Sequence, residues 1–308
     1  MIVVKFLLLI LGFVMLIKGA DWFVDGAAGL AKKLKIPEIV IGLTVVAMGT
    51  SLPEASVSIS SALKNSADLA VGNVLGSNLL NILIILGLTS MICPLAVKKN
   101  TCLIEMPFLV LMTVLLFVLG LDGSLNRIDG IIFIVCFCVY LLYLLKSAKN
   151  NDEKPEETKD MPVWKLLLAL VVGMGIVILG SNITVDSASY IAKAAGVSER
   201  MIGLTVVALG TSLPELVTCI IAAKKKSADL AIGNIVGSNI FNILFVLGLT
   251  SVITVVPYQV AFLKDALFAI LSSVMLLLGS VICKKKITRF MGFLFLVTYG
   301  IYFVVIVL

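Results

Sequence analysis

The chain alternates between long apolar stretches and short polar segments along its whole length. Each stretch is about 20 residues long, which is the length that a helix needs to cross the hydrocarbon core of a bilayer. The stretches cover residues 2–24, 39–63, 69–92, 102–121, 126–147, 163–183, 201–223, 230–253, 259–282 and 288–308. A helix satisfies its own backbone hydrogen bonds in lipid, and the sequence lacks the alternating pattern of barrel strands. The pattern therefore predicts an all-α membrane protein with ten transmembrane helices.

Composition supports lipid as the main solvent of this chain. Hydrophobic residues make up 60% of the 308 positions and charged residues 14%. Soluble domains contain about 45–50% apolar and about 25% charged residues, so a soluble fold could not cover this much apolar surface. The first stretch runs into a polar motif at 19–25 that recurs in altered form later in the chain. We therefore do not interpret that stretch as a removable signal peptide.

The basic residues gather on one of the two sides that ten spans define. The net charge is +6. Most lysines and arginines fall in the loops that follow the odd-numbered spans, among them Lys98-Lys99, Lys224-Lys225-Lys226 and Lys284-Lys285-Lys286. By the positive-inside rule these loops are cytoplasmic and both termini lie outside, in a multi-pass protein of the cell (plasma) membrane. The positive charge is thus explained by topology, and no nucleic-acid partner is expected.

The second half of the sequence repeats the first at a constant offset of 161 residues. The motif Gly49-Thr50-Ser51-Leu52-Pro53-Glu54 returns as Gly210-Thr211-Ser212-Leu213-Pro214-Glu215. Roughly two-thirds of positions 38–90 are identical to their partners, far more than apolar composition alone produces. Five spans per unit is an odd number, so the second unit enters the membrane upside down. Two inverted five-helix repeats are typical of transporters, whose substrate site lies near the midplane where the repeats meet.

The repeat divides the chain into three parts. Residues 1–147 form the first five-helix repeat, 148–162 a cytoplasmic linker, and 163–308 the second, inverted repeat. The linker is short, polar and of mixed charge, which favours a solvated tether over a regulatory domain. Nothing in the sequence requires an oligomer, and a monomer is the expectation.

Two acidic residues occupy equivalent positions about halfway along the second and seventh spans, Glu54 and Glu215. A carboxylate at the bilayer centre costs roughly 2.5–3.5 kcal/mol on insertion scales, so two of them imply compensation. The inverted symmetry brings the two spans together, and we expect the carboxylates to face one cavity and share a cation. Their two negative charges suit one divalent ion or two monovalent ions. The alternative is a pair of protonated carboxyls that hydrogen-bond between helices.

Oxygen ligands accompany each acid. Hydroxyls stand at positions i and i+1 relative to the acid at i+4, on one side of a helix: Thr50 and Ser51 before Glu54, Thr211 and Ser212 before Glu215. Carboxylates, hydroxyls and carbonyls are hard ligands, the set that Ca²⁺ and Na⁺ prefer. Ordinary hydrogen bonding between helices is the alternative for any single hydroxyl.

A proline precedes each glutamate and should bend its helix. Pro53 and Pro214 lack an N–H and clash with the carbonyl four residues back. We expect released carbonyl oxygens around Ala47–Thr50 and Ala208–Thr211.

The third and eighth spans add further polar residues on one helix face, namely Ser77 and Asn81 with their copies Ser238 and Asn242. The motifs Gly72-x-x-x-Gly76 and Gly233-x-x-x-Gly237 let a neighbouring helix approach closely. This approach would deliver the serine and asparagine side chains to the acids. Helix packing alone explains the glycines, but it does not explain the amides.

These duplicated motifs resemble the two α-repeats of sodium/calcium exchangers, in the calcium/cation antiporter superfamily. They cover about a third of the chain, and the ten-helix layout extends the resemblance over all of it. The resemblance implies that Glu54 and Glu215, with backbone oxygens near Thr50 and Thr211, hold Ca²⁺. It implies that Na⁺ shares the glutamates and adds the carbonyls of Ala47 and Ala208 and the hydroxyls of Ser51, Ser77, Ser212 and Ser238. It also implies that spans 1 and 6 slide against the other eight.

One departure from the family pattern concerns Asn242, where some relatives, including potassium-dependent ones, carry Asp. Both amide positions are neutral here, which makes potassium coupling less expected and leaves the sodium stoichiometry open.

The sequence thus predicts a sodium/calcium antiporter that works by alternating access, with Ca²⁺ and Na⁺ as transported ions and no permanently bound cofactor. A proton/calcium antiporter remains the alternative within the class, and a passive cation channel could use the same acids. An enzyme is not expected, because no nucleophile–base pair or His-containing metal motif is present.

Overall fold

The computed structural model describes residues 2–64, 67–149, 161–196 and 208–307. Within these residues seven helical stretches are long and apolar enough to span a membrane: Ile2–Lys33, Asp68–Ile92, Thr101–Asp122, Arg127–Ala148, Val163–Ala194, Ala228–Ile253 and Val260–Ile282. A bent pair, Glu38–Thr50 and Leu52–Leu63, is an eighth candidate, and Arg289–Val305 is a shorter apolar helix. The span predicted at 201–223 begins outside the described residues. The fold is therefore helical and of membrane type, whereas the count of ten stays a prediction.

The elements of the first half are α1 (Ile2–Lys33), α2 (Glu38–Ile41), the π-helix η1 (Gly42–Val46), α3 (Ala47–Thr50), α4 (Leu52–Leu63), α5 (Asp68–Leu79), the π-helix η2 (Leu80–Leu86), α6 (Gly87–Ile92), β1 (Leu95–Ala96), the π-helix η3 (Thr101–Glu105), α7 (Met106–Leu119), the 3₁₀ turn η4 (Gly120–Asp122), β2 (Ser124–Leu125) and α8 (Arg127–Lys149). Those of the second half are α9 (Val163–Ala194), α11 (Ala208–Thr211), α12 (Leu213–Lys224), α13 (Ala228–Phe241), the π-helix η6 (Asn242–Leu247), α14 (Gly248–Ile253), β3 (Val256–Pro257), α15 (Val260–Ile282), β4 (Lys286–Ile287) and α16 (Arg289–Val307).

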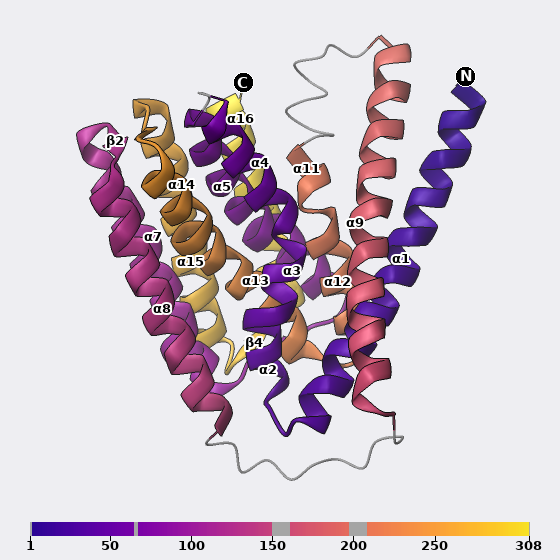
Figure 1. The fold of residues 1–308 in the computed structure, drawn as a ribbon. Coiled ribbons are helices and arrows are strands. Elements are labelled where there is room, and N and C mark those ends of the chain that lie inside the picture. The colour runs from indigo at the N-terminus through magenta and orange to yellow at the C-terminus, as the bar shows by residue number, and fades with distance from the viewer. Residues whose placement is uncertain (1, 65–66, 150–160, 197–207, 308) are drawn as a thin grey trace.

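The two longest helices, α1 and α9, lie side by side and run in opposite directions at one edge of the bundle (Figure 1). They are equivalent elements of the sequence repeat, and their antiparallel course is the one that an inverted repeat requires. The start of α1 and the end of α16 lie at one end of the molecule, and the end of α8 and the start of α9 lie at the other. Helix α8 ends at Lys149 and α9 begins at Val163, and the division of the chain at 148–162 stays a prediction.

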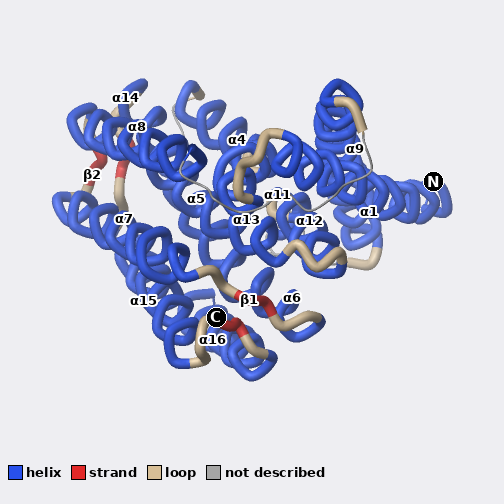
Figure 2. Tube along the Cα trace, turned by 90° about the horizontal axis from the view of Figure 1, so that it is seen from below, coloured by secondary structure: helices blue, strands red, loops and turns tan. Residues whose placement is uncertain are grey.

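The helix α13 lies in the middle of the bundle (Figure 2). In the most apolar part of the helical stretch Ala228–Ile253, which α13 begins, 94% of residues are buried, compared with 17% for α1. This difference separates a central helix from a peripheral one. The glycines of α13 allow very close contact with η1, because a methyl group added at Gly233 would lie 2.9 Å from the Cα of Gly42. One added at Gly237 would lie 2.7 Å from the Cα of Leu43. The predicted role in close helix approach is therefore confirmed for the second glycine motif. It is wrong for the first, because a carbon added at Gly72 meets only the Phe262 side chain and one added at Gly76 meets no described atom within 4 Å.

Two short antiparallel sheets join the halves of the chain at opposite ends of the bundle. Strand β1 pairs with β4 through Leu95 and Ile287, and β2 pairs with β3 through Leu125 and Val256. Each sheet takes one strand from each half, and Leu95 and Val256 are equivalent positions in the repeat. The pairs tie the loops of one repeat to those of the other.

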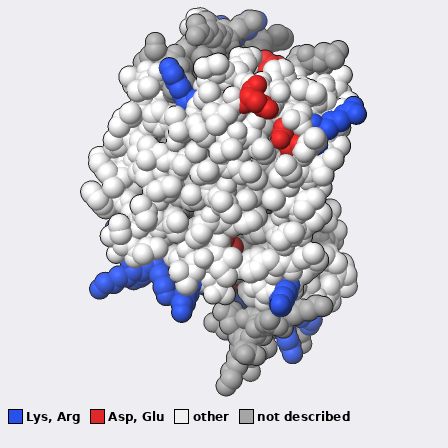
Figure 3. Space-filling view, turned by 90° about the vertical axis from the view of Figure 1, so that its left-hand side faces the viewer, with Lys and Arg blue, Asp and Glu red and all other residues white. Residues whose placement is uncertain are grey.

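The outer surface has an apolar belt between two polar ends. On α8 the exposed side chains recur every three or four residues, at Ile128, Ile131, Val135, Val139 and Leu142, as expected for a helix face in contact with lipid. Figure 3 shows few charges on the central part of one face and a concentration of Lys and Arg at one end. This distribution is that of a membrane protein.

Candidate functional site

The bend in the first broken helix places Glu54 near the centre of the bundle. Ser51, between α3 and α4, leaves helical geometry with φ −85° and ψ 9°, and Pro53 follows in the first turn of α4. The predicted break in the helix falls at Ser51. The Ser51 N–H still donates to the Ala47 carbonyl at 3.0 Å, so the Ala47 carbonyl keeps its helical partner and is not released as expected. Ser212 has the same backbone shape, with φ −91° and ψ 5° before α12.

Glu54 and Glu215 each accept a hydrogen bond from a serine in the opposite half of the chain. The Ser51 hydroxyl donates to Glu215 Oε1 at 3.1 Å, and the Ser212 hydroxyl donates to Glu54 Oε1 at 3.4 Å. Ser77 adds a longer contact of 3.5 Å to Glu54 Oε1. Each carboxylate is 1% exposed. The crossed pattern joins four of the predicted residues in one buried cluster.

The second oxygen of each carboxylate, Oε2 of Glu54 and of Glu215, has no hydrogen-bond partner among the described residues. A buried carboxylate without a full set of partners is costly, and the cost falls when a cation occupies the place of the missing donors. Two amide oxygens, Oδ1 of Asn81 and of Asn242, are buried without a partner as well. All four atoms are acceptors, so the unsatisfied groups call for a positively charged species.

Four asparagines form a hydrogen-bonded cluster between the third and eighth predicted spans. Asn78 and Asn239 each donate from Nδ2 to the backbone carbonyl of the other, both at 3.1 Å. Asn81 Nδ2 donates to Asn239 Oδ1 at 2.9 Å, and Asn242 Nδ2 donates to Asn78 Oδ1 at 3.1 Å. Asn81 and Asn242 each use an N–H in this cluster, and their Oδ1 atoms have no partner among the described residues. The structure therefore does not show these two amides donating to the glutamates.

Sequence reasoning missed the structural role of Asn73, Asn78, Asn234 and Asn239, although all four stand in the repeated motif. Asn73 Nδ2 donates to the Glu54 carbonyl at 3.1 Å and to the Ser58 hydroxyl at 2.9 Å, which fixes α5 against α4. The Thr50 hydroxyl donates to Asn234 Oδ1 at 2.9 Å. The sequence did carry a signal for these asparagines, because the Gly-Asn and Gly-Ser-Asn segments that hold them are identical in the two halves.

The remaining predicted residues lie around this cluster. The Ser238 hydroxyl donates to the Ala47 carbonyl at 3.4 Å, which links α13 to α3. Thr211 lines the cavity described in the next paragraph, and Ala208 begins α11, next to residues outside the described part.

That cavity has a volume of about 680 Å³ and lies between α4, α9 and α11, in the half of the molecule that holds both chain ends. Pro53 and Thr211, one residue before Glu54 and Ser212 respectively, line it, together with Asp186 from α9. The cavity therefore reaches the neighbourhood of the carboxylate cluster from one end of the molecule.

A helical membrane bundle with two buried, crossed carboxylates between its halves belongs to the class of ion-transporting membrane proteins. The family model described as sodium/calcium exchanger protein matches the chain twice, over residues 4–146 and 165–308. The chain belongs to this family.

Named relatives and a solved structure agree with the assignment. The putative antiporter CaxA of Alkalimonas amylolytica is 43% identical over 79% of both chains. The sodium/calcium exchanger MaX1 of Methanosarcina acetivorans is 31% identical, over 81% of this chain and 83% of its own length. The structure of the sodium-calcium exchanger NCX_Mj soaked with zero Na⁺ and Ca²⁺ superposes with a TM-score of 0.87 at 33% identity, over 98% of both chains.

Proposed function

We propose that the protein is a secondary active transporter that exchanges Na⁺ for Ca²⁺ across the cell membrane by alternating access. The observation that carries the proposal is the pair of crossed carboxylates, Glu54 and Glu215, each with one oxygen that lacks a partner among the described residues. Ca²⁺ takes six to eight oxygen ligands, and the two acids with nearby hydroxyl, amide and carbonyl oxygens offer such a set. The names of the relative MaX1 and of NCX_Mj support the same ion pair.

We infer sodium rather than protons as the coupling ion because MaX1 and NCX_Mj are named sodium/calcium exchangers. A proton needs only a carboxylate oxygen, and in a proton antiporter the neutral ligands beside the acids would serve Ca²⁺ alone. A sodium ion needs several oxygens, and Ser51, Ser77 and Ser212 already contact the carboxylates. We propose that Ca²⁺ is held by the two glutamates with Thr50 and Thr211. Sodium then uses the same glutamates with the carbonyls of Ala47 and Ala208, the serines named above and Ser238, with Asn81 and Asn242 lining the site.

Neutralisation of the two acids gives a physical reason for coupled exchange. Either one Ca²⁺ or Na⁺ ions offset the buried charge, so a loaded carrier can change its accessible side. An empty carrier keeps two unpaired anions in a low-dielectric interior, and its reorientation is hindered.

The proposed topology has ten spans in two inverted five-helix repeats, with both termini outside and the 148–162 segment in the cytoplasm. The concentration of lysines at the end opposite the two termini supports this orientation. The antiparallel course of α1 and α9 supports the inversion.

Reconstituted vesicles test the function directly. Purified protein is placed in liposomes, and ⁴⁵Ca²⁺ uptake is followed against an outward gradient of Na⁺, K⁺ or H⁺ in turn. We expect uptake with the Na⁺ gradient. Uptake driven only by a proton gradient would establish the proton antiporter instead. Uptake that follows the Ca²⁺ gradient with no counter-ion would establish a channel.

The variants Glu54→Gln and Glu215→Gln test the site. Removing one of two charges beside a divalent ion costs several kcal/mol, so Na⁺-driven uptake should fall by about a hundredfold or more at low Ca²⁺. Asp265→Asn is the matched control, because Asp265 is a carboxylate of α15 that accepts a 3.0 Å hydrogen bond from Tyr302, apart from the cluster. Wild-type uptake in either glutamine variant would show that the site is assigned to the wrong residues.

A further inference from the structure

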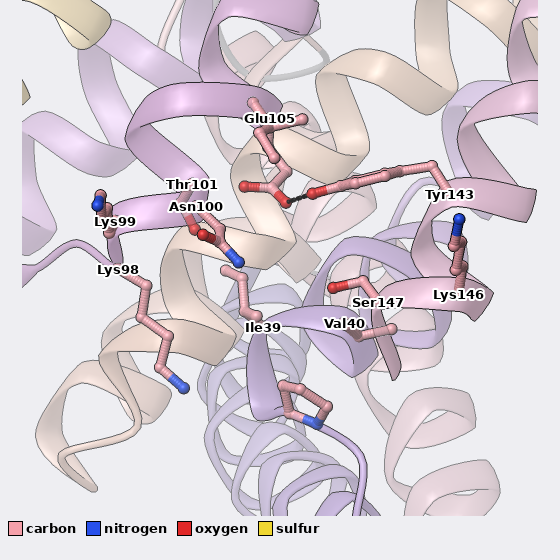
Figure 4. Close-up of a pocket in the computed structure, with 12 residues that line it drawn as sticks. Ile39, Val40, Lys98, Lys99, Asn100, Thr101, Glu105, Tyr143, Lys146 and Ser147 are labelled. Carbon is pink, nitrogen blue, oxygen red and sulfur yellow. Dashed lines mark hydrogen bonds between the residues drawn. The ribbon is translucent and has the colours of Figure 1, made fainter. Parts of the chain in front are cut away.

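A second polar cavity lies at the lysine-rich end of the molecule, away from the carboxylate cluster. It has a volume of about 690 Å³ and is formed by the start of α2, the loop before η3, η3 itself and the end of α8 (Figure 4). Three lysines line it, Lys98, Lys99 and Lys146. Lys98 already pairs with Asp229 at 2.9 Å, so Lys99 and Lys146, both exposed, are the cations left for a ligand.

The inner wall of the cavity carries the opposite charge. Glu105 is 3% exposed, and its Oε1 accepts a 2.6 Å hydrogen bond from the Tyr143 hydroxyl. Its Oε2 has no hydrogen-bond partner among the described residues. Figure 4 shows the Glu105 carboxylate between Lys99 on one side and Lys146 on the other, with the Asn100 amide below it. The carboxylate calls for a positively charged donor, and the lysines call for an anion.

Apolar surface adjoins the cavity. Ile104 lines it and is 42% exposed, and Leu103 beside it is 59% exposed. Leu142 and Leu145 on α8, next to the lining residues Tyr143 and Lys146, are exposed as well. A ligand that fills the cavity can therefore continue along an apolar face of the protein, where the acyl chains of a bilayer lie.

We propose that this cavity binds the headgroup of phosphatidylethanolamine. The primary ammonium donates to Glu105 Oε2, the phosphate lies at Lys99 and Lys146, and the acyl chains follow the apolar face of Leu103 and Ile104. Basic pockets between membrane helices on the cytoplasmic side bind anionic lipid headgroups, and here the buried Glu105 carboxylate adds an acceptor for an ammonium group. The alternatives fit less well. A free metal ion would meet two lysines and a single carboxylate, a headgroup whose only charge is its phosphate brings no cation to Glu105, and a choline headgroup has no N–H to donate.

Native mass spectrometry of the full chain tests the proposal, with dioleoyl phosphatidylethanolamine, phosphatidylcholine and phosphatidylglycerol offered in equal amounts. We expect the ethanolamine lipid to be bound in about tenfold excess over the choline lipid, the preference given by one charge-assisted hydrogen bond. Glu105→Gln should bring this ratio close to one. The control is Asp265→Asn, which changes a carboxylate in the second half of the chain that also accepts a hydrogen bond from a tyrosine. It should leave the ratio unchanged.

A second variant keeps the test valid if Glu105→Gln does not fold. Lys99→Gln combined with Lys146→Gln changes only exposed positions and should lower the binding of the ethanolamine lipid about tenfold by removing both phosphate contacts. Equal binding of the three lipids by the wild type would overturn the proposal, and so would preference for the glycerol lipid. Competition by soluble phosphoethanolamine at the same concentration would overturn the assignment to a bilayer lipid. The test does not measure transport, so its failure would leave the proposed exchange untouched.

Discussion

At the residue scale, the side-chain amide of Asn242 is neutral and adds no charge to the carboxylate cluster. Its Nδ2 donates to Asn78 at 3.1 Å, and its Oδ1 is buried without a partner. Glu54 and Glu215 therefore supply the negative charge of the cluster, while Asn242 and Asn81 supply dipoles. Two charges match one Ca²⁺, and a third would change both affinity and pH dependence.

The variant Asn242→Asp tests this charge balance. An added carboxylate should raise the apparent Ca²⁺ affinity about tenfold or more at pH 8.5, because it adds an attraction of a few kcal/mol at short range. The gain should disappear as the pH falls and the new carboxyl takes up a proton, which gives an acid-sensitive limb to the profile. The measurement is the half-saturating Ca²⁺ concentration for Na⁺-driven uptake across pH 5.5–8.5.

Asn126→Asp is the control for that experiment. Asn126 Oδ1 accepts the Ile128 N–H at 2.7 Å at the start of α8, and an aspartate oxygen can accept the same bond. The Asn126→Asp variant should leave the apparent Ca²⁺ affinity and its pH profile at wild-type values. If Asn242→Asp gave the same flat result, Asn242 would not line the ion site.

How far the sequence predicts individual residues depends on what each contact needs. The repeat located Glu54, Glu215 and the serines, because a charge in an apolar stretch stands out and duplication rules out chance. The hydrogen bonds between Asn78 and Asn239 could not be predicted, since each side chain donates to the backbone carbonyl of the other residue, which is far away in the sequence. The amide groups of Asn81 and Asn242 were expected at the acids, and the structure shows their nitrogens donating to the side chains of Asn239 and Asn78.

At the element scale, the contact between α1 and α9 depends on glycines seven residues apart. Gly12, Gly19 and Gly26 on α1 face Gly180, Gly173 and Leu170 on α9. A methyl group added at Gly173 would lie 2.8 Å from the Gly19 carbonyl oxygen and one added at Gly19 would lie 2.9 Å from that of Gly173. The two helices thus pack backbone against backbone, which would hold them together as one unit in the movement against the other helices that the family resemblance implies.

The variant Gly173→Val should separate α1 from α9. Overpacking of this kind costs about 1–3 kcal/mol, so we expect a lower midpoint of thermal unfolding in detergent and a loss of Na⁺-driven uptake. Gly175→Val, two residues along the same helix, is the control because an added side-chain carbon there meets no described atom within 4 Å. Equal effects of the two substitutions would show that neither thermal stability nor uptake depends on the close contact between α1 and α9.

Helix positions followed from apolar length, whereas their internal irregularities did not. The predicted stretch 69–92 corresponds to α5, η2 and α6 together, with a π-helical segment at Leu80–Leu86. The bend at Ser51 was predicted because Pro53 has a local steric effect. The sheets that join β1 to β4 and β2 to β3 depend on pairing between the two halves of the chain, which no local pattern encodes. Nothing in the apolar pattern marks the π-helices η2 and η6.

At the scale of the whole molecule, the two ends of the α1–α9 pair differ. At the lysine-rich end, Lys225 in the turn after α12 bridges Asp21 at 2.6 Å and Asp25 at 2.7 Å on α1. At the other end the equivalent residues by the repeat are Lys64, Asn182 and Asp186. Asn182 and Asp186 line the open cavity of about 680 Å³, and Lys64 makes no ion pair with any described residue. The end that holds both chain termini thus has an open cavity next to the carboxylate cluster, whereas at the lysine-rich end α1 is tied to the turn after α12 by the ion pairs of Lys225.

The repeat makes this difference a prediction about two conformations. If the halves exchange their shapes during transport, Lys64 should approach Asp186 when the cavity closes, while Lys225 leaves α1. The ion pairs of Lys225 then stabilise the conformation seen here. They are partly exposed, so each contributes only about 0.2–1 kcal/mol, and their removal should shift the balance between conformations by a few-fold.

The variant Lys225→Met tests this shift through the reactivity of a cysteine in the cavity. Ser56 lines the cavity and is exposed, so Ser56→Cys should react readily with a soluble maleimide while the cavity is open. Adding Lys225→Met should slow that reaction about two- to fivefold, because the open conformation loses its ion pairs to Asp21 and Asp25. Lys224→Met removes the same charge one residue earlier and should have no effect. The rate is measured in nanodiscs, where both faces are accessible and the result does not depend on the orientation in the membrane. An unchanged rate in Lys225→Met would mean that these ion pairs do not select between the two conformations.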